Sequence, residues 1–198
     1  LLSGTEKYWL KGLAYYDAGA RSFYTKEKKI NSPEDLDGLK IRVMESKTAF
    51  DMVKALGGSP TPISFGELYT SLQQGVVDGA ENNPPSFYLS RHYEVCKYYT
   101  LDEHTILPDV LLMSTHIWDS FSDQERGWLS QAVKESVIEQ RKLWAESEKQ
   151  SLDAVKEAGV EIIIPDKTLF SKKSKKILES YKEDEVLYDF INRIKNTK

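Results

Sequence analysis

The segment of residues 122–158 most constrains the fold of this chain, because it contains no proline and can form one unbroken helix. Ser122 is followed three residues later by Glu125, which is the spacing of a capping box at a helix N-terminus. Gly159 follows directly, and glycine is the usual residue for ending a helix. At about 1.5 Å per residue the helix would be roughly 55 Å long, whereas a small domain is only about 30 Å wide. We therefore expect a helix that runs across two lobes, and small ligands commonly bind in clefts between lobes.

Short strand-like and helical segments alternate on the N-terminal side of this helix. Strands are predicted at residues 12–16, 21–24, 39–44, 79–82, 98–104 and 109–114, and helices at residues 5–11, 48–56, 68–73 and 86–93. This alternation is typical of α/β architecture with a largely parallel sheet. A coiled coil is the alternative for such a long helix, and the α/β pattern around it is the reason to prefer a bridging helix.

The composition excludes several classes of protein. The chain has 198 residues, of which 40% are hydrophobic, so it can bury a core rather than remain disordered. Lys and Arg number 27 against 31 Asp and Glu, and the net charge of −4 disfavours binding to nucleic acid. The longest apolar runs, residues 110–113 and 162–164, are far shorter than the roughly 20 residues of a membrane-spanning helix. Cys96 is the single cysteine, so no internal disulfide can form.

No motif for catalysis or for metal binding is present. The sequence contains no glycine-rich phosphate loop, no G-x-S-x-G and no H-E-x-x-H. The histidines, His92, His104 and His116, are spaced twelve residues apart, which is not a metal-ligand spacing within one element. We expect no metal and no cofactor. Asp and Glu are abundant, and since the sequence singles out no pair of them, a catalytic carboxylate pair stays an open alternative.

Two arginines lie where they could hold an anionic ligand. Arg42 lies near the carboxyl end of the strand predicted at 39–44, and in open α/β sheets that end faces the ligand crevice. Arg21 follows Gly19 and Ala20, and the glycine suggests a close approach of the backbone. Two guanidinium groups could clamp one anion, because their geometry matches a carboxylate in a two-pronged contact. The alternative is that Arg42 is exposed on a half-solvated sheet.

A second polar cluster, residues 81–85, ends the strand predicted at 79–82. The amides of Asn82 and Asn83 could hydrogen-bond to sugar hydroxyls. Asn and Pro are also common in turns, which is the alternative. Phe65 follows a proline-rich turn and is either a core residue or a ring that stacks on a ligand.

Several dispersed blocks occur in a specific order: GLKIRV at residues 38–43, LGGSPTP at 56–62 and ELYTSLQQGVVDGAEN at 67–82. With these blocks the chain resembles the substrate-binding P subunit of TRAP transporters, the DctP-like family, from about Tyr8 to the C-terminus. The resemblance implies an α/β, two-lobed fold of the type II-like periplasmic-binding-protein kind, with the lobes bridged by the long helix and most of the N-terminal lobe absent. It implies that residues 20–107 and 148–198 form the second lobe. Residues 1–19 and 108–147 would then be the remnant of the first lobe and the first half of the bridging helix.

The resemblance also implies a set of ligand-binding residues. They are Arg42, Arg21, Asn82, Phe65, Glu81, Glu45 and His104. In the family, the arginine at the position of Arg42 pairs with the ligand carboxylate and the one at Arg21 assists. The aromatic ring at Phe65 packs on the ligand, and the asparagine at Asn82 hydrogen-bonds to it. Glu45 stands where several relatives carry asparagine.

The resulting expectation is an extracytoplasmic solute-binding protein of a TRAP transporter rather than an enzyme. It would capture a small organic acid, such as a sugar acid of the hexuronate class, and deliver it to the membrane permease subunits. The signal peptide is not in this sequence, and a chain with part of a lobe absent could self-associate through unpaired strand edges. The alternatives are a two-lobed α/β enzyme acting on a small carboxylate, or a helical interaction module without a small ligand.

Overall fold

The computed structural model of the protein describes residues 2–196, so the outermost ends of the two predicted lobes, residues 1 and 197–198, lie outside the described residues. The strands are β1 (Leu10–Tyr16), β2 (Ala20–Thr25), β3 (Lys40–Val43), β4 (Ser59–Pro62), β5 (Gly79–Asn82), β6 (Tyr98–Ile106), β7 (Asp109–Ser114) and β8 (Glu161–Ile163). The helices are α1 (Lys47–Leu56), α2 (Leu68–Gln74), α3 (Pro84–Leu89), α4 (Thr115–Ser120), α5 (Asp123–Glu157), α6 (Lys167–Ser180) and α7 (Glu185–Lys195).

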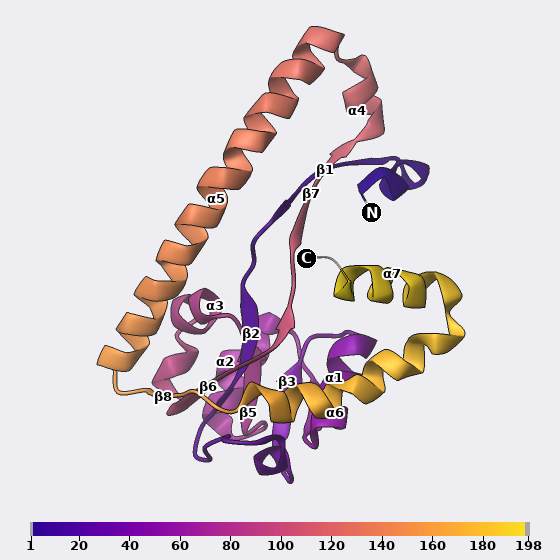
Figure 1. Cartoon of the computed structure of the whole chain (residues 1–198). Helices are drawn as coiled ribbons and strands as arrows, with labels where there is room; N and C mark the ends of the chain where they lie inside the picture. The colour runs from indigo at the N-terminus through magenta and orange to yellow at the C-terminus, as the bar shows by residue number, and fades with distance from the viewer. Residues whose placement is uncertain (1, 197–198) are drawn as a thin grey trace.

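A six-stranded sheet in the order β4-β3-β5-β2-β6-β8 forms the main body. The expectation of a largely parallel sheet is confirmed, since five of its six strands run in the same direction; β2 is the exception and runs antiparallel to both of its neighbours, β5 and β6. The other pairings, β3 with β4, β3 with β5 and β6 with β8, are parallel. β2 runs in the opposite direction because the chain enters it from the end of the sheet at which it leaves β5 and β6 (Figure 1). Their carboxyl ends therefore lie at the end of the sheet where β2 begins.

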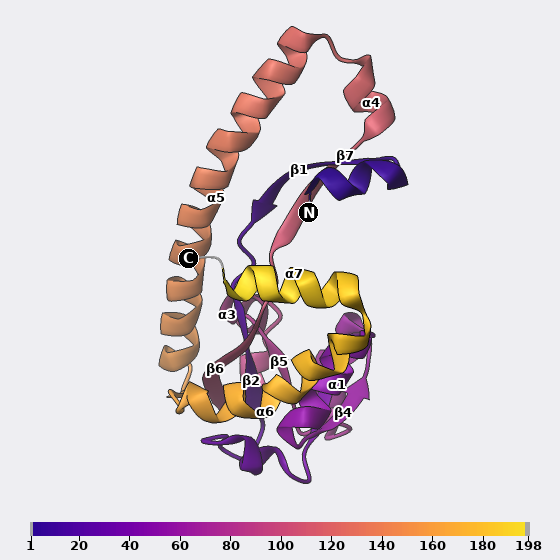
Figure 2. The same cartoon turned by 45° about the vertical axis from the view of Figure 1, so that its right-hand side comes forward.

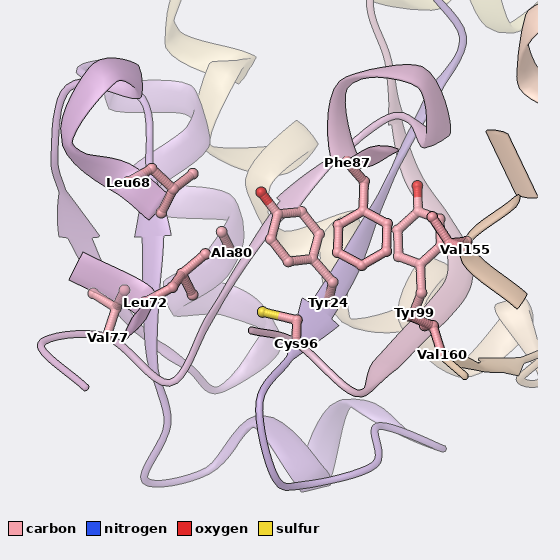
Figure 3. Close-up of a cluster of buried hydrophobic side chains, with 10 residues drawn as sticks. All are labelled: Tyr24, Leu68, Leu72, Val77, Ala80, Phe87, Cys96, Tyr99, Val155 and Val160. Atoms are coloured by element: carbon pink, nitrogen blue, oxygen red, sulfur yellow. The ribbon is translucent and has the colours of Figure 1, made fainter. Parts of the chain in front are cut away.

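Hydrophobic clusters cover both faces of this sheet. Consecutive residues of a strand point to opposite faces, so Phe23 and Tyr24 of β2 are buried in different clusters. One cluster joins Tyr24 to residues of α2, α3 and the last turns of α5, and Figure 3 shows it. Its buried members are Tyr24, Leu68, Leu72, Val77, Ala80, Phe87, Cys96, Tyr99, Val155 and Val160. The other cluster joins Phe23 to α1 and to Phe170 of α6. The sheet is thus the middle layer between two layers of helices.

β1 and β7 form a separate, two-stranded antiparallel sheet that leads away from the main body (Figures 1 and 2). α5 runs beside it as one unbroken helix of 35 residues and packs against β1 and α3. The capping box at Ser122 and Glu125 is present at its N-terminus, which confirms the predicted helix. Among the helices of the described residues, none is both long and apolar enough to cross a membrane.

Two predicted helices differ from the structure. Residues 5–11 were expected to form a helix, but the chain forms a 3-10 helix at Leu2–Tyr8 and then a strand from Leu10, because Leu10 pairs with Ser114 of β7. The helix expected at 86–93 begins earlier, at Pro84, and ends at Leu89. Proline suits the first helical positions, where no backbone N–H partner is needed.

Candidate ligand-binding site

A cavity of about 510 Å³ lies where the chain crosses between the two sheets. Its walls include Arg21, Arg42, Phe65, Asn82, Asn83, Ser86, Asp109 and Trp144. Arg42 and Asn82 stand at the carboxyl ends of β3 and β5, which is where the strand-end rule for α/β sheets places a ligand. Asp109 and Trp144 reach the same cavity from β7 and α5. The structure therefore brings together four of the residues selected from the sequence: Arg21, Arg42, Phe65 and Asn82.

Arg42 is a buried cation, only 3% exposed, and the alternative of an exposed strand residue is wrong. Its Nε donates a hydrogen bond of 2.7 Å to the carbonyl of Ile63, and its guanidinium lies over the Phe65 ring at 5.7 Å from the ring centre. No carboxylate of residues 2–196 forms an ion pair with it, and its two terminal nitrogens donate to no described residue. Burial lowers the pKa of Arg42, yet a guanidinium stays charged at neutral pH. Because an unpaired buried charge is costly, this site favours an anion.

Phe65 supplies an open aromatic face beside that cation. Its side chain is 46% exposed although it contacts both Arg42 and His92. His92 was not selected from the sequence; its Nδ1 lies 2.9 Å from the hydroxyl of Tyr24. Burial, and then the nearby charge of Arg42, lower the pKa of His92 to about 4. His92 is therefore neutral at pH 7 and adds no second positive charge beside Arg42.

Arg21 is used mainly within the protein. Its Nε and Nη2 donate to the two carboxylate oxygens of Glu81 at 2.5 and 2.8 Å, and Nη2 also donates to the Glu81 carbonyl at 2.8 Å. Its Nη1 donates to Oδ1 of Asn82 at 2.9 Å. The backbone N–H of Asn83 donates to the same Oδ1, also at 2.9 Å. These bonds fix the Asn82 amide, whose Nδ2 finds no acceptor among the described residues and is left for a ligand.

His104 lies behind this pair rather than in the wall of the cavity. Its ring is buried against Phe23, with 4.3 Å between ring centres, and its Nδ1 lies 2.7 Å from the carboxylate of Asp102. Its Nε2 lies 3.6 Å from Glu81. Burial lowers the pKa of His104, but Asp102 and Glu81 outweigh burial and raise it to about 9. The charges of Arg21 and His104 balance those of Glu81 and Asp102, which leaves Arg42 as a buried cation without a balancing charge among residues 2–196.

Other residues are placed differently from the predicted site. Glu45 is exposed and does not line the cavity. Glu81 and His104 line a neighbouring cavity of about 290 Å³ between α1 and α6. Asp109 and Trp144 cannot be predicted from sequence, because only the folded chain brings β7 and α5 to the ends of β3 and β5. Among residues 2–196, no cluster of His, Cys, Asp or Glu could hold a metal ion.

The comparison with family models decides the family. The model described as bacterial extracellular solute-binding protein, family 7 (DctP), matches residues 1–184. The chain belongs to the DctP family. The predicted recognition is thereby confirmed, and DctP-family members are solute-binding components of transport systems rather than enzymes.

Curated relatives agree with the DctP assignment. A solute-binding protein of Chromohalobacter salexigens is 42% identical over 146 residues, which are 72% of this chain and 44% of that protein. The C4-dicarboxylate-binding periplasmic protein DctP of Rhodobacter capsulatus is 33% identical over 157 residues, 79% of this chain and 47% of that protein. The chain thus spans somewhat less than half the length of these two relatives.

Solved structures of DctP-family proteins confirm the α/β fold class. A TRAP periplasmic solute-binding protein of a Bradyrhizobium species, in complex with D-galacturonate, matches with a TM-score of 0.89 and 44% identity over 99% of this chain and 66% of that chain. One from Roseobacter denitrificans, with bound β-D-glucuronate, matches with a TM-score of 0.93 and 38% identity over 100% of this chain and 66% of that chain.

Proposed function

We propose that this DctP-family protein captures a hexuronate, a six-carbon sugar with one carboxylate, for a TRAP transporter. The observation that carries the proposal is the buried guanidinium of Arg42, which has no counter-ion among the described residues and lies against the open face of Phe65. A carboxylate would supply the charge that this cation lacks, and a sugar ring would supply an apolar face for Phe65. The bound galacturonate and glucuronate of the two structural neighbours support the choice of ligand class.

The geometry supports a role for each residue of the site. The two terminal nitrogens of Arg42 would hold the carboxylate in a two-pronged contact, and Nδ2 of Asn82 would donate to a further ligand oxygen. Arg21 would act mainly by holding Asn82, because most of its donors are already used by Glu81 and Asn82. Glu81 and His104 would support Arg21 from behind, and Glu45 has no contact in this proposal.

The two sheets suggest how the protein would work. We assign the six-stranded sheet to a lobe made of residues 20–107 and 148–198, and the β1–β7 sheet to a lobe containing residues 1–19 and 108–147. The chain crosses between the sheets at residues 17–19 and 107–108, so these segments would be hinges. Binding would close the lobes on the ligand, and the loaded protein would deliver it to the permease from the periplasmic or extracytoplasmic side.

A thermal-shift screen with organic acids tests this function. The protein is used at the length that its own cell produces, called the natural-length protein below. A hexuronate at a hundred times its Kd should stabilise the folded state by about 2.7 kcal/mol. For a chain of 150–250 residues that corresponds to a rise in Tm of roughly 5–10 °C, and a longer chain gives a smaller rise. The absence of a shift with every acid would refute the proposal and favour an interaction module, whereas conversion of the acid to a product would favour an enzyme.

A further inference from the structure

We infer that Asp109 makes the site selective for sugars with one carboxylate over sugars with two; this inference rests on the proposed function. Asp109 is the first residue of β7, and its register opposite Tyr16 fixes it beside the crossover to the six-stranded sheet. It lines the same cavity as Arg42. Within residues 2–196 its side chain takes part in no hydrogen bond or ion pair, so it remains free to meet a ligand.

The charges in the cavity wall have a defined arrangement. Three charged residues line it: Arg21, Arg42 and Asp109. Arg21 is neutralised by Glu81, so Arg42 and Asp109 are the charges in the wall that lack an ion-pair partner among the described residues. Arg42 belongs to the six-stranded sheet and Asp109 to the two-stranded one, so the positive and negative charges stand on different walls. The cavity therefore matches a ligand with an anionic end and a neutral, hydrogen-bond-donating end.

This arrangement separates two kinds of sugar acid. When the carboxylate of a hexuronate is held by Arg42, the ring hydroxyls that face β7 can donate to Asp109, and a carboxylate is a strong acceptor for them. A diacid held by one carboxylate at Arg42 brings its second carboxylate toward Asp109. At about 4 Å, repulsion between two carboxylates weakens binding roughly fivefold in a water-like medium, and by more when the ligand excludes water.

The experiment compares two probes that share a hydroxylated six-carbon chain. D-glucuronate has one carboxylate and D-glucarate has two. Titration calorimetry on the natural-length protein should give the wild type a preference for glucuronate of at least about tenfold. In Asp109→Asn, glucarate should bind more tightly and glucuronate about two- to fivefold more weakly, so the preference should fall at least fivefold.

Two further variants and one change of conditions sharpen the test. Asp109→Glu keeps the charge and should keep the preference, whereas Asp119→Asn removes an exposed carboxylate of α4, outside the cavity, and should change nothing. Added salt should reduce the preference of the wild type more than that of Asp109→Asn, because it screens the repulsion. Circular dichroism should show that all variants are folded.

The outcomes distinguish this inference from the proposed function. Tight binding of glucuronate with the same preference in wild type and Asp109→Asn would overturn the role of Asp109 and leave the proposed function standing. A wild type that binds neither probe, nor any other hexuronate, would overturn both. A preference that falls in Asp109→Asn and returns in Asp109→Glu is the result we expect.

Discussion

Gln140 of α5 binds both polar groups of the Asp17 backbone: its Oε1 accepts a hydrogen bond from the Asp17 N–H at 2.9 Å, and its Nε2 donates to the Asp17 carbonyl at 2.7 Å. Asp17 lies in the crossover between β1 and β2. Nearby, the hydroxyl of Tyr16 lies 2.8 Å from that of Ser136, also on α5. The long helix therefore holds the crossover in one position, at the edge of the candidate site.

We expect Gln140→Leu to loosen this crossover. The variant loses two hydrogen bonds, each worth about 0.5–1.5 kcal/mol, but the exposed Asp17 peptide can turn to water, so the free energy of unfolding should fall by about 1–2 kcal/mol. Hydrogen–deuterium exchange should also become faster at the Asp17 amide. Gln131→Leu is the matched control, because Gln131 lies on the same helix and bonds only to the exposed Glu135. Equal exchange at Asp17 in both variants would contradict this role for Gln140.

Gly19 should not tolerate a side chain. Its φ of +71° is in the left-handed region, and a Cβ built there would collide with the Glu148 carboxylate and lie 2.9 Å from Nε1 of Trp144. Gly19→Ala should therefore lower the free energy of unfolding by about 1–3 kcal/mol in urea denaturation. Gly127→Ala is the opposite case, since Gly127 lies within α5 with no atom near its Cβ position. It should stabilise the protein by about 0.5–1 kcal/mol, and equal effects of the two substitutions would contradict the packing at Gly19.

The buried His104 should make stability depend on pH. Its pKa rises from 6.5 to about 9 in the folded protein because of Asp102 and Glu81, which outweigh the opposing effect of burial. A raised folded-state pKa gives stability that is fully present below pH 6.5 and is lost as the pH rises through about 9. The rise in pKa from 6.5 to about 9 bounds the lost stability at roughly 3–4 kcal/mol.

Urea denaturation between pH 6 and pH 9.5 measures this loss, with His104→Gln as the reference. The difference in unfolding free energy between wild type and variant should shrink as the pH rises. His92 is present in both proteins, so its own titration cancels in the difference. A difference that does not change with pH would show that folding does not raise the pKa of His104.

The sequence predicted those features that depend on neighbouring residues. The capping box at Ser122 and the absence of proline indicate α5 because helix formation along this stretch is a local property. The place of Arg42 near the carboxyl end of a predicted strand likewise indicated a ligand-binding residue. The sequence could not predict that β2 runs antiparallel to β5 and β6. The direction of a strand depends on which end of the sheet the preceding crossover reaches, and this is a property of the whole fold. No sequence motif marks Asp109 as a site residue, because it reaches the cavity from β7, which belongs to the separate two-stranded sheet.

The central test of the site is Arg42→Lys. Lysine keeps the positive charge but offers a single ammonium point in place of a planar, two-pronged donor, and it loses the stacking over Phe65. A buried carboxylate that is poorly paired typically costs about 2–5 kcal/mol of binding free energy. That corresponds to a loss of roughly thirty- to several-thousand-fold in affinity for a hexuronate, measured by titration calorimetry on the natural-length protein.

Lys40→Arg, an exposed change on the same strand, should leave the affinity unaltered. Circular dichroism should show that Arg42→Lys is folded. Arg42 has no ion-pair partner among residues 2–196, so the substitution leaves no buried carboxylate without its counter-ion. Equal affinities in a folded Arg42→Lys and the wild type would remove Arg42 from the site, and the proposed function would then rest on family membership alone.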